Sequence, residues 1–250
     1  MLITAGEIIK QSWVNYKKCW RKFLPYMISL LLPTVILSAL SVISLYLQVY
    51  IPSSSFISSI IIILVFAAGM VFLLWASISL AKELKNCVTG QEQHWKSVFS
   101  ESHGLIWPVI YTSILASLIV LGGTILLVIP GIIFSLWYGF AFYAVVFEDK
   151  KGFNALKASK ELVVGRWWAI FWRALAPGFV FVIISVALNY GIGFLVGRLE
   201  TAGIFGKLGS VLLFNILNSS ASVLIAPMTA LASVLLYLSA KETRTSPTNS

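Results

Sequence analysis

The residues best suited to chemistry lie in one polar stretch between two apolar runs. Glu92-Gln93-His94 and Glu101-Ser102-His103 each place a carboxylate two positions before a histidine, and Cys87 is nearby. Carboxylate and imidazole groups can bind a metal ion or act as an acid–base pair. Residues two apart on a helix point in different directions, however. We therefore interpret the stretch as a solvated loop, keep a metal or acid–base site as the alternative, and expect no catalytic residue and no cofactor.

A second acidic position follows the apolar run 131–147. Glu148 and Asp149 come directly after this run, and Asp149 is the only Asp of the chain. Glu148 could pair with Arg166 or Lys150 and so position the helix that follows. It could equally be an ordinary charged group at a helix end. The sequence leaves both interpretations open.

Three amides interrupt the last two apolar runs: Asn189, Asn215 and Asn218. They could line a polar path through a helix bundle, or they could hydrogen-bond between neighbouring helices. We prefer the second interpretation. Proton- and ion-coupled transporters usually keep ionisable groups in their spans, and the apolar runs of this chain contain none. A pump or proton symporter is therefore disfavoured, whereas a passive pore is not.

The apolar runs themselves determine the class of protein. Hydrophobic residues make up 59% of the 250 residues and charged residues 11%, and no charged residue occurs between Lys22 and Lys82. A helix over that interval would be about 90 Å long, roughly three times the hydrocarbon thickness of a bilayer, so the chain must cross and return. We predict an all-α, polytopic membrane helix bundle with six transmembrane helices in three hairpins. The predicted spans are 24–47, 57–81, 106–129, 131–147, 174–197 and 209–238.

The predicted connections follow from turn residues. The first hairpin should turn within 48–56, and the second at Pro130-Gly131, with Gly122-Gly123 as the rival position. Residues 1–240 would form a single integral membrane domain, and 241–250 a disordered cytoplasmic tail.

The distribution of positive charge predicts the orientation. Of the 18 Lys and Arg residues, all except Arg198 and Lys207 fall before the first predicted span, after the last, or in the second and fourth connections. We expect the protein to lie in the cell membrane. Because Lys and Arg collect in cytoplasmic loops, we expect both of its termini in the cytoplasm. The net charge of +9 then reflects topology and not nucleic-acid binding. Cys19 and Cys87 would both lie in the reducing cytosol, so we expect no disulfide.

Amphipathic helices should precede some of the spans. Thr4 and Glu7 have the spacing of a capping box, and a helix over residues 5–22 should follow. Its aromatic face would carry Trp13 and Trp20 with its lysines opposite, which suits the membrane interface. Residues 154–173 repeat this pattern. Ser159 and Trp167 are spaced like Ser12 and Trp20, Gly165 should break the helix, and Trp167 and Trp168 would be interfacial. A third copy is expected around 95–107.

Residues 128–173 also carry a longer pattern. It contains Ile-Pro-Gly before a span, an acid at the end of that span, an Ala-Leu-x-x-Ser-x-x-Leu helix and Gly-Arg-x-Trp; its members are Ile129, Pro130, Gly131, Glu148, Ala155, Leu156, Ser159, Leu162, Gly165, Arg166 and Trp168. This pattern resembles the membrane-domain family found attached to some glycerophosphoryl diester phosphodiesterases. In that family the hydrolase is a separate soluble barrel, for which this chain has no room, so the resemblance implies a membrane module and not catalysis.

These observations favour a non-enzymatic membrane protein. The leading hypothesis is a module that contacts anionic lipid headgroups at the cytoplasmic face, or scaffolds a partner there. A permease or passive channel for a neutral or lipid-like substrate is the first alternative, and a role accessory to glycerophospholipid metabolism is the second. The sequence leaves protein partners and oligomeric state open.

Overall fold

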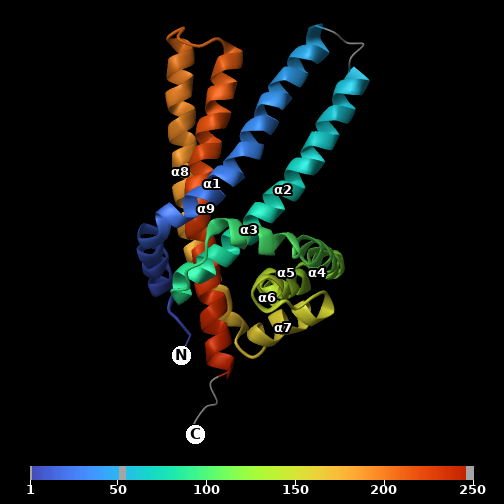
Figure 1. Cartoon of the computed structure of the whole chain (residues 1–250), viewed down its shortest axis with the longest axis vertical. Coiled ribbons are helices and arrows are strands. Elements are labelled where there is room, and N and C mark those ends of the chain that lie inside the picture. The colour runs from blue at the N-terminus through green and yellow to red at the C-terminus, as the bar shows by residue number, and fades with distance from the viewer. Residues whose placement is uncertain (1, 51–54, 246–250) are drawn as a thin grey trace. The chain divides into compact units, whose positions relative to one another are not determined.

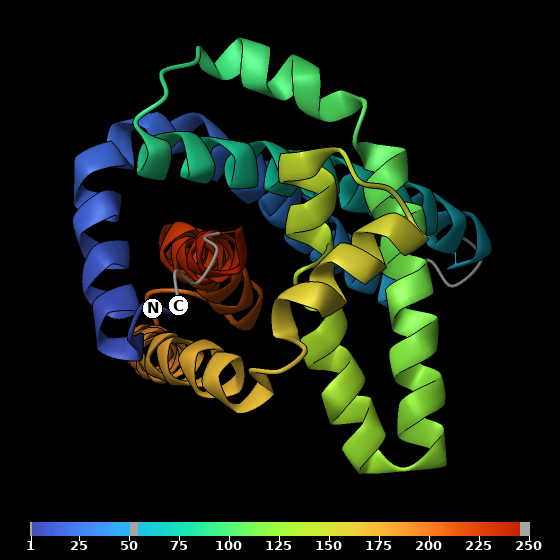
Figure 2. The ribbon, with the colours of Figure 1, turned by 90° about the horizontal axis from the view of Figure 1, so that it is seen from below.

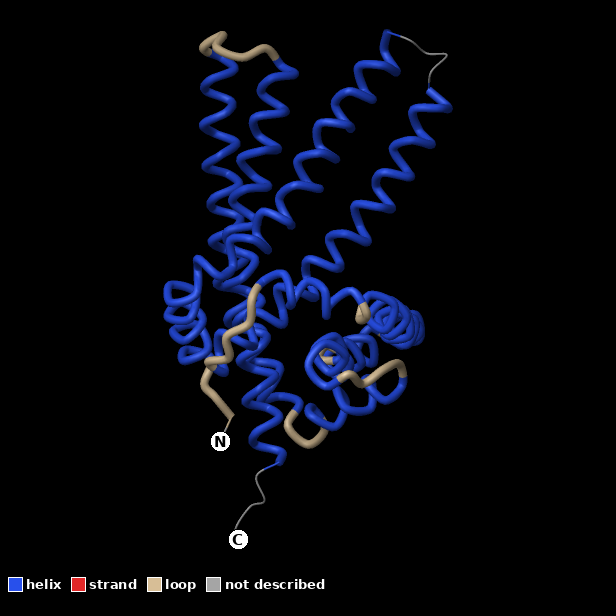
Figure 3. Tube along the Cα trace, in the orientation of Figure 1, coloured by secondary structure: helices blue, strands red, loops and turns tan. Residues whose placement is uncertain are grey.

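The computed structural model describes residues 2–50 and 55–245, and every regular element in these residues is an α-helix (Figures 1 and 3). The helices are α1 (Ala5–Tyr50), α2 (Ser55–Thr89), α3 (Trp95–His103), α4 (Ile106–Leu126), α5 (Val128–Tyr138), α6 (Ala141–Glu148), α7 (Phe153–Val163), α8 (Trp167–Thr201) and α9 (Lys207–Thr245). Residues 51–54 of the first predicted turn, including Pro52, lie outside the described residues.

Six of these segments are long and apolar enough to cross a membrane. They correspond one to one with the six predicted spans, with α5 and α6 together forming the fourth. The all-α class and the three hairpins, α1–α2, α4–α5 and α8–α9, are thus confirmed. Long runs without charge indicate segments that can lie in hydrocarbon. Such segments must be helical, because a helix satisfies every backbone hydrogen bond within itself.

Two predicted boundaries are wrong at the ends of the chain. The interfacial helix 5–22 and the first span are a single helix, α1, because Pro25 and Pro33 each remove one backbone donor without ending the helix. At the other end, α9 continues to Thr245. Residues 241–245 are therefore helical and not part of a disordered tail, while 246–250 lie outside the described residues.

The helices belong to two compact units. Unit 1 comprises 1–23, 78–179 and 227–250, and unit 2 comprises 24–77 and 180–226, so α1, α2, α8 and α9 contribute to both. In unit 1 the apolar faces of α3 to α7 form a core that includes Val98, Val109, Val145, Leu156 and Val163. Within unit 1, the two views show α4 and α5 to one side of the C-terminal part of α9 and roughly perpendicular to it (Figures 1 and 2). Unit 1 is therefore not a simple bundle of parallel spans.

In unit 2, by contrast, α8 and α9 expose many large apolar side chains. Val182, Phe194 and Leu195 on α8 and Val211 on α9 are among them. Hydrocarbon accommodates such surfaces, whereas water does not.

The second hairpin turns three residues before the predicted position. α4 ends at Leu126, Leu127 alone is extended, and α5 begins at Val128. Pro130 therefore lies in the first turn of α5, where its missing N–H is not needed. A Cβ on Gly131 would stand 2.2 Å from Oγ1 of Thr124, so the tight packing of the two helices requires glycine here.

The rival turn site at Gly122-Gly123 is not used, because both glycines lie inside α4. The fourth span, predicted as one helix, is instead broken at Gly139-Phe140 into α5 and α6.

Ser159 of α7 repairs this break. Its hydroxyl donates a hydrogen bond to the carbonyl oxygen of Trp137 (2.6 Å) and accepts one from the backbone N–H of Phe140 (3.1 Å). These are backbone groups that an interrupted helix leaves without partners. Ser159, predicted from its pattern only, thus links α7 to the point where α5 ends.

The orientation predicted from charge can be tested with single cysteines in a Cys19→Ser/Cys87→Ser background. Gln91 and Ala202 are exposed residues in the second and fifth connections. Because Lys and Arg favour the cytoplasm, Ala202→Cys should react with an impermeant maleimide added to intact cells. Gln91→Cys should react only after permeabilisation. Reaction of Gln91→Cys in intact cells would contradict the predicted orientation.

Candidate lipid-contact site

Four tryptophans of unit 1 each have a cation over the ring. The distances from the cation to the ring centroid are 4.7 Å for Lys17 on Trp13, 5.6 Å for Arg21 on Trp20, 5.5 Å for Lys96 on Trp95 and 4.3 Å for Lys160 on Trp137. We call these eight residues the tryptophan belt. Trp13, Trp20 and Trp95 are 48%, 45% and 42% exposed. Each pair thus holds an indole ring and a positive charge close together, and in three of the four pairs the ring is exposed.

This arrangement corrects the predicted faces of the first helix. The sequence was expected to place the aromatic residues on one side and the lysines on the other, but Trp13 and Lys17, four residues apart, share a side. The buried stripe is instead Ile8, Ser12 and Cys19, continuing to Phe23. Thr4 caps this helix as predicted, because its hydroxyl oxygen accepts from the N–H of Glu7 at 3.3 Å.

The third interfacial helix, expected around 95–107, is α3. His94 caps it, with Nδ1 accepting a hydrogen bond from the backbone N–H of Lys96 (3.3 Å). Glu92 binds Lys22 of α1 at 3.0 Å, and this hydrogen bond lowers the pKa of the Glu92 carboxyl. Glu101 lies 3.6 Å from Lys82.

The two Glu-x-His pairs therefore serve different local contacts. Among the described residues, no group of three or more His, Cys, Asp or Glu side chains could hold a metal ion.

Glu148 is the centre of an ion cluster, although not with the predicted partner. Its carboxylate lies 3.0 Å from Nζ of Lys150 and 2.9 Å from Nζ of Lys241, and it accepts a hydrogen bond from the hydroxyl of Tyr237. Tyr237 and Lys241 are one turn apart on α9, so they face the same carboxylate. The pairing with Lys150 was one of the predicted options, whereas the contact with α9 was not predicted.

Arg166 also binds α9 and not Glu148. Its guanidinium donates to the carbonyl oxygen of Ala240 (2.5 Å) and to Oγ1 of Thr243 (2.6 Å). The predicted clasp between Glu148 and Arg166 is therefore wrong. Both residues instead hold the C-terminal turns of α9 within unit 1. Local sequence patterns give no sign of Tyr237, Lys241 and Thr243, because these residues lie between 77 and 93 positions from their partners.

The predicted break at Gly165 is confirmed. Gly165 has φ of +84°, a conformation that β-branched residues resist, and it separates α7 from α8. Beyond it, the rings of Trp167 and Phe171 are stacked, with centroids 5.0 Å apart. Trp168 is largely exposed, as predicted for an interfacial residue, whereas Trp167 is half-buried and its indole nitrogen has no hydrogen-bond partner among the described residues.

The amides of unit 2 are partly brought together. Nδ2 of Asn189 donates to Oδ1 of Asn218 at 2.8 Å, which joins α8 to α9. These two residues line an open groove of about 310 Å³ together with Ser185, Tyr190 and Ser222. Asn215 is half-buried and does not line this groove. The hydrogen bond matches the preferred interpretation of the amides as a link between helices.

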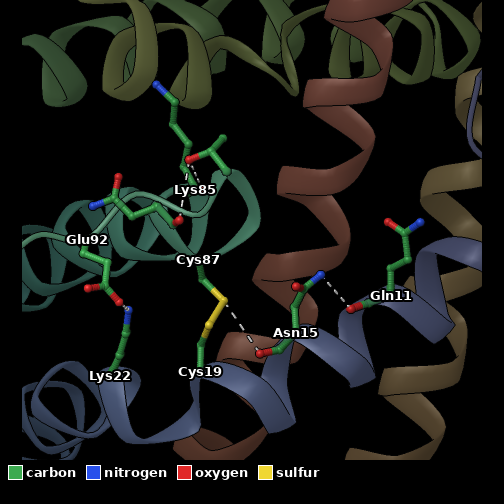
Figure 4. The surroundings of a disulfide bond; sticks show 9 residues. Gln11, Asn15, Cys19, Lys22, Lys85, Cys87 and Glu92 are labelled. Carbon is green, nitrogen blue, oxygen red and sulfur yellow. Dashed lines mark hydrogen bonds and ion pairs between the residues drawn. A yellow bond between two sulfur atoms is a disulfide. The ribbon is translucent and has the colours of Figure 1, made fainter.

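Cys19 and Cys87 form a disulfide between α1 and α2, which contradicts the expectation that neither cysteine is paired (Figure 4). That expectation rested on the predicted cytosolic location of both cysteines, whereas the fold brings their Cα atoms, 68 residues apart in the chain, to 6.3 Å. The neighbouring ion pair between Lys22 and Glu92 joins the same two segments. The N-terminal part of α1 is thus fixed to the end of α2 by a covalent bond and by charge.

The Glu148–Tyr237 contact predicts energetic coupling. We expect Glu148→Gln and Tyr237→Phe each to lower the free energy of unfolding in mixed micelles, and the double variant to lose less than the sum by about 0.5–3 kcal/mol. Glu92→Gln combined with Tyr237→Phe is the matched control. Those two residues share no partner, so their effects should add within about 0.5 kcal/mol. Equal additivity in both cycles would show that Glu148 does not bind Tyr237.

The disulfide predicts a redox-dependent stability. Closing a 68-residue loop restricts the unfolded chain and should stabilise the fold by about 4 kcal/mol. Reduction should therefore lower the thermal midpoint of the purified protein, while the Cys87→Ser variant should be insensitive to reductant. Differential alkylation followed by mass spectrometry establishes the starting redox state. An unchanged midpoint after verified reduction would contradict a stabilising role.

Comparison with protein-family models, with curated proteins and with solved structures finds no match to this chain. The resemblance of residues 128–173 to the phosphodiesterase-associated membrane domains therefore stays a prediction.

Proposed function

We propose that this protein is a multi-pass membrane module that binds anionic lipid headgroups through the tryptophan belt and has no catalytic activity of its own. The observation that carries the proposal is the stacking of four cations on four tryptophans of unit 1. We further propose that the belt faces the cytoplasmic leaflet of the cell membrane, since most Lys and Arg residues lie on that side of the predicted topology.

The physical basis is that the indole ring and the cation of each pair both favour the headgroup region of the bilayer. Indole rings favour the headgroup region because one end is apolar and the other donates a hydrogen bond. Each Lys or Arg near an anionic leaflet contributes about 1 kcal/mol. A cation above an exposed ring gains about a further 0.5–1 kcal/mol. Its remaining N–H donors stay free to bind a phosphate oxygen. Stacking therefore holds the charge at the level where phosphates lie.

The belt cations come from separate segments. Lys17 and Arg21 belong to α1, Lys96 to α3 and Lys160 to α7. The Cys19–Cys87 disulfide and the Lys22–Glu92 pair join α1 to the end of α2 and the loop before α3. The part of the belt on α1 and α3 is fixed in this way and should lose little conformational freedom when it binds lipid, which supports a recognition role.

A permease or passive channel for a neutral substrate remains the alternative. The observation in its favour is the groove beside Asn189 and Asn218. Asn189→Ala/Asn218→Ala should then change the flux of neutral solutes into proteoliposomes, whereas a lipid-contacting module should show no flux above empty vesicles. A role accessory to glycerophospholipid metabolism would follow only if the resemblance of 128–173 holds.

The belt can be tested with variants of equal charge. Lys17→Gln/Arg21→Gln/Lys96→Gln removes three belt cations, and Lys10→Gln/Lys18→Gln/Lys151→Gln removes three exposed lysines outside the belt. Native mass spectrometry of protein from mixed nanodiscs measures the retained ratio of phosphatidylglycerol to phosphatidylcholine. We expect the belt variant to lose about tenfold or more of this preference, since three charges contribute up to about 3 kcal/mol.

The control variant Lys10→Gln/Lys18→Gln/Lys151→Gln should lose much less of the preference for phosphatidylglycerol. Equal losses in the two variants would mean that net charge alone attracts anionic lipid, and the belt would have no specific role.

A further inference from the structure

A cavity of about 600 Å³ lies in unit 1 between α5 and the start of α8. Ile129, Ile132 and Trp137 line it from α5, and Gly165, Trp168 and Phe171 line it from the other side. Its volume is in the range of small-molecule sites, which are typically lined by apolar and aromatic side chains. Neither the ion cluster at Glu148 nor the Asn189–Asn218 groove shares these residues, and the cavity meets the tryptophan belt only at Trp137.

The walls of the cavity are held in place before any ligand arrives. Phe171 stacks on Trp167, which also lines the cavity, and Trp168 packs edge-on against both rings. Gly165 contributes no side chain, and even a Cβ there would meet nothing within 4 Å. The left-handed turn at Gly165 therefore leaves this side of the cavity open. Preformed apolar walls lower the conformational cost of binding.

The ammonium group of Lys160 lies beside one wall of the cavity. Nζ of Lys160 lies 4.3 Å above the ring of Trp137, and Lys160 is one helical turn before Val164, another lining residue. A ligand that fills the cavity with hydrocarbon would thus have an ammonium group within reach of an attached anion. This combination of apolar walls and an adjacent cation matches an anionic amphiphile.

The cavity opens to the surface of unit 1, and a single flexible hydrocarbon chain can lie along its apolar walls. Since a bilayer already solvates hydrocarbon, the apolar walls alone give little selectivity. The discrimination between lipids must come from the headgroup contact.

We propose that this cavity holds one acyl chain of an anionic phospholipid and that Lys160 binds its phosphate. The proposal rests on the proposed function, because it assigns to one lipid a defined place beside the belt. It concerns a bound lipid with its own site, and not the general attraction of the belt for an anionic leaflet.

The test uses the full chain in nanodiscs with phosphatidylglycerol that carries a diazirine on one acyl chain. After irradiation, peptide mass spectrometry should find the lipid on the lining segments of α5 and α8. Ile132→Trp fills the cavity, and Ile183→Trp is the matched control on the surface of unit 2; the two isoleucines are 46% and 51% exposed. We expect Ile132→Trp to lower labelling of the lining peptides at least about fivefold and Ile183→Trp to leave it unchanged.

The headgroup contact needs a second comparison. Lys160→Gln should lower the labelling by diazirine phosphatidylglycerol relative to diazirine phosphatidylcholine about fivefold, because the wall residues remain and only the cation is lost. The variant Lys17→Gln/Arg21→Gln/Lys96→Gln should keep the parent's ratio of labelling by the two lipids. The proposed lipid binding by the belt and the proposed lipid site in the cavity can therefore fail independently of each other.

Three results would overturn the proposal. The first is absence of lining-peptide labelling in the parent protein, and the second is equal loss in Ile132→Trp and Ile183→Trp. The third is capture of a second copy of the chain, instead of lipid, by a photoreactive benzoylphenylalanine at position 132. An unchanged lipid ratio in Lys160→Gln would overturn the assignment of the phosphate to Lys160.

Discussion

The exclusion of charge from hydrocarbon is the constraint on which the rest of this structure depends. An ionised side chain in the centre of a bilayer is costly, and each unpaired backbone group there costs several kcal/mol. The apolar runs must therefore be helical, and the Lys, Arg, Glu and Asp residues must gather at the ends of the spans. Most of them consequently fall in unit 1, which also contains the tryptophans that begin α3 and α8 and those of the N-terminal part of α1.

Within unit 1 these charged groups fix the helices to one another. Glu148 and Arg166 both bind the last turns of α9, Glu148 through Tyr237 and Lys241 and Arg166 through Ala240 and Thr243. Ser159 satisfies the backbone where α5 gives way to α6. Because such contacts are made in a partly dry environment, each leaves a buried partner unsatisfied when it is lost. The tryptophan belt and the cavity beside Trp137 are thus surfaces of a connected framework.

The sequence predicted the parts of this account that depend on local pattern. Runs without charge located the six spans, the Thr4–Glu7 spacing located the start of α1, and Gly165 marked the end of α7. Contacts between distant segments were not accessible in this way. The Cys19–Cys87 bond, the binding of Arg166 to α9 and the stacking of Lys160 on Trp137 all require the fold itself. The face of α1 was also misjudged, since the small residues Ser12 and Cys19 are buried and the larger Trp13 and Trp20 are exposed.

The disulfide and the charge distribution predict opposite sides of the membrane for the N-terminal part of α1. Stable disulfides are typical of oxidising compartments, whereas Lys and Arg collect in the cytoplasm. Cys19 lies between Lys18 and Arg21, so both demands fall on the same helical turns. If these turns lie in the cytosol, the thiols should be reduced for most of the time and paired only under oxidising conditions.

The depth of the tryptophan belt in the bilayer tests the central claim most directly. Spin labels on Val14→Cys and Ser100→Cys, both exposed neighbours of belt residues, can be compared with a label on Val182→Cys of α8 in a Cys19→Ser/Cys87→Ser background. Power saturation with oxygen and with a nickel chelate reports depth. The account predicts headgroup depth for positions 14 and 100 and hydrocarbon depth for position 182. Positions 14 and 100 found in bulk water, or as deep as position 182, would contradict it.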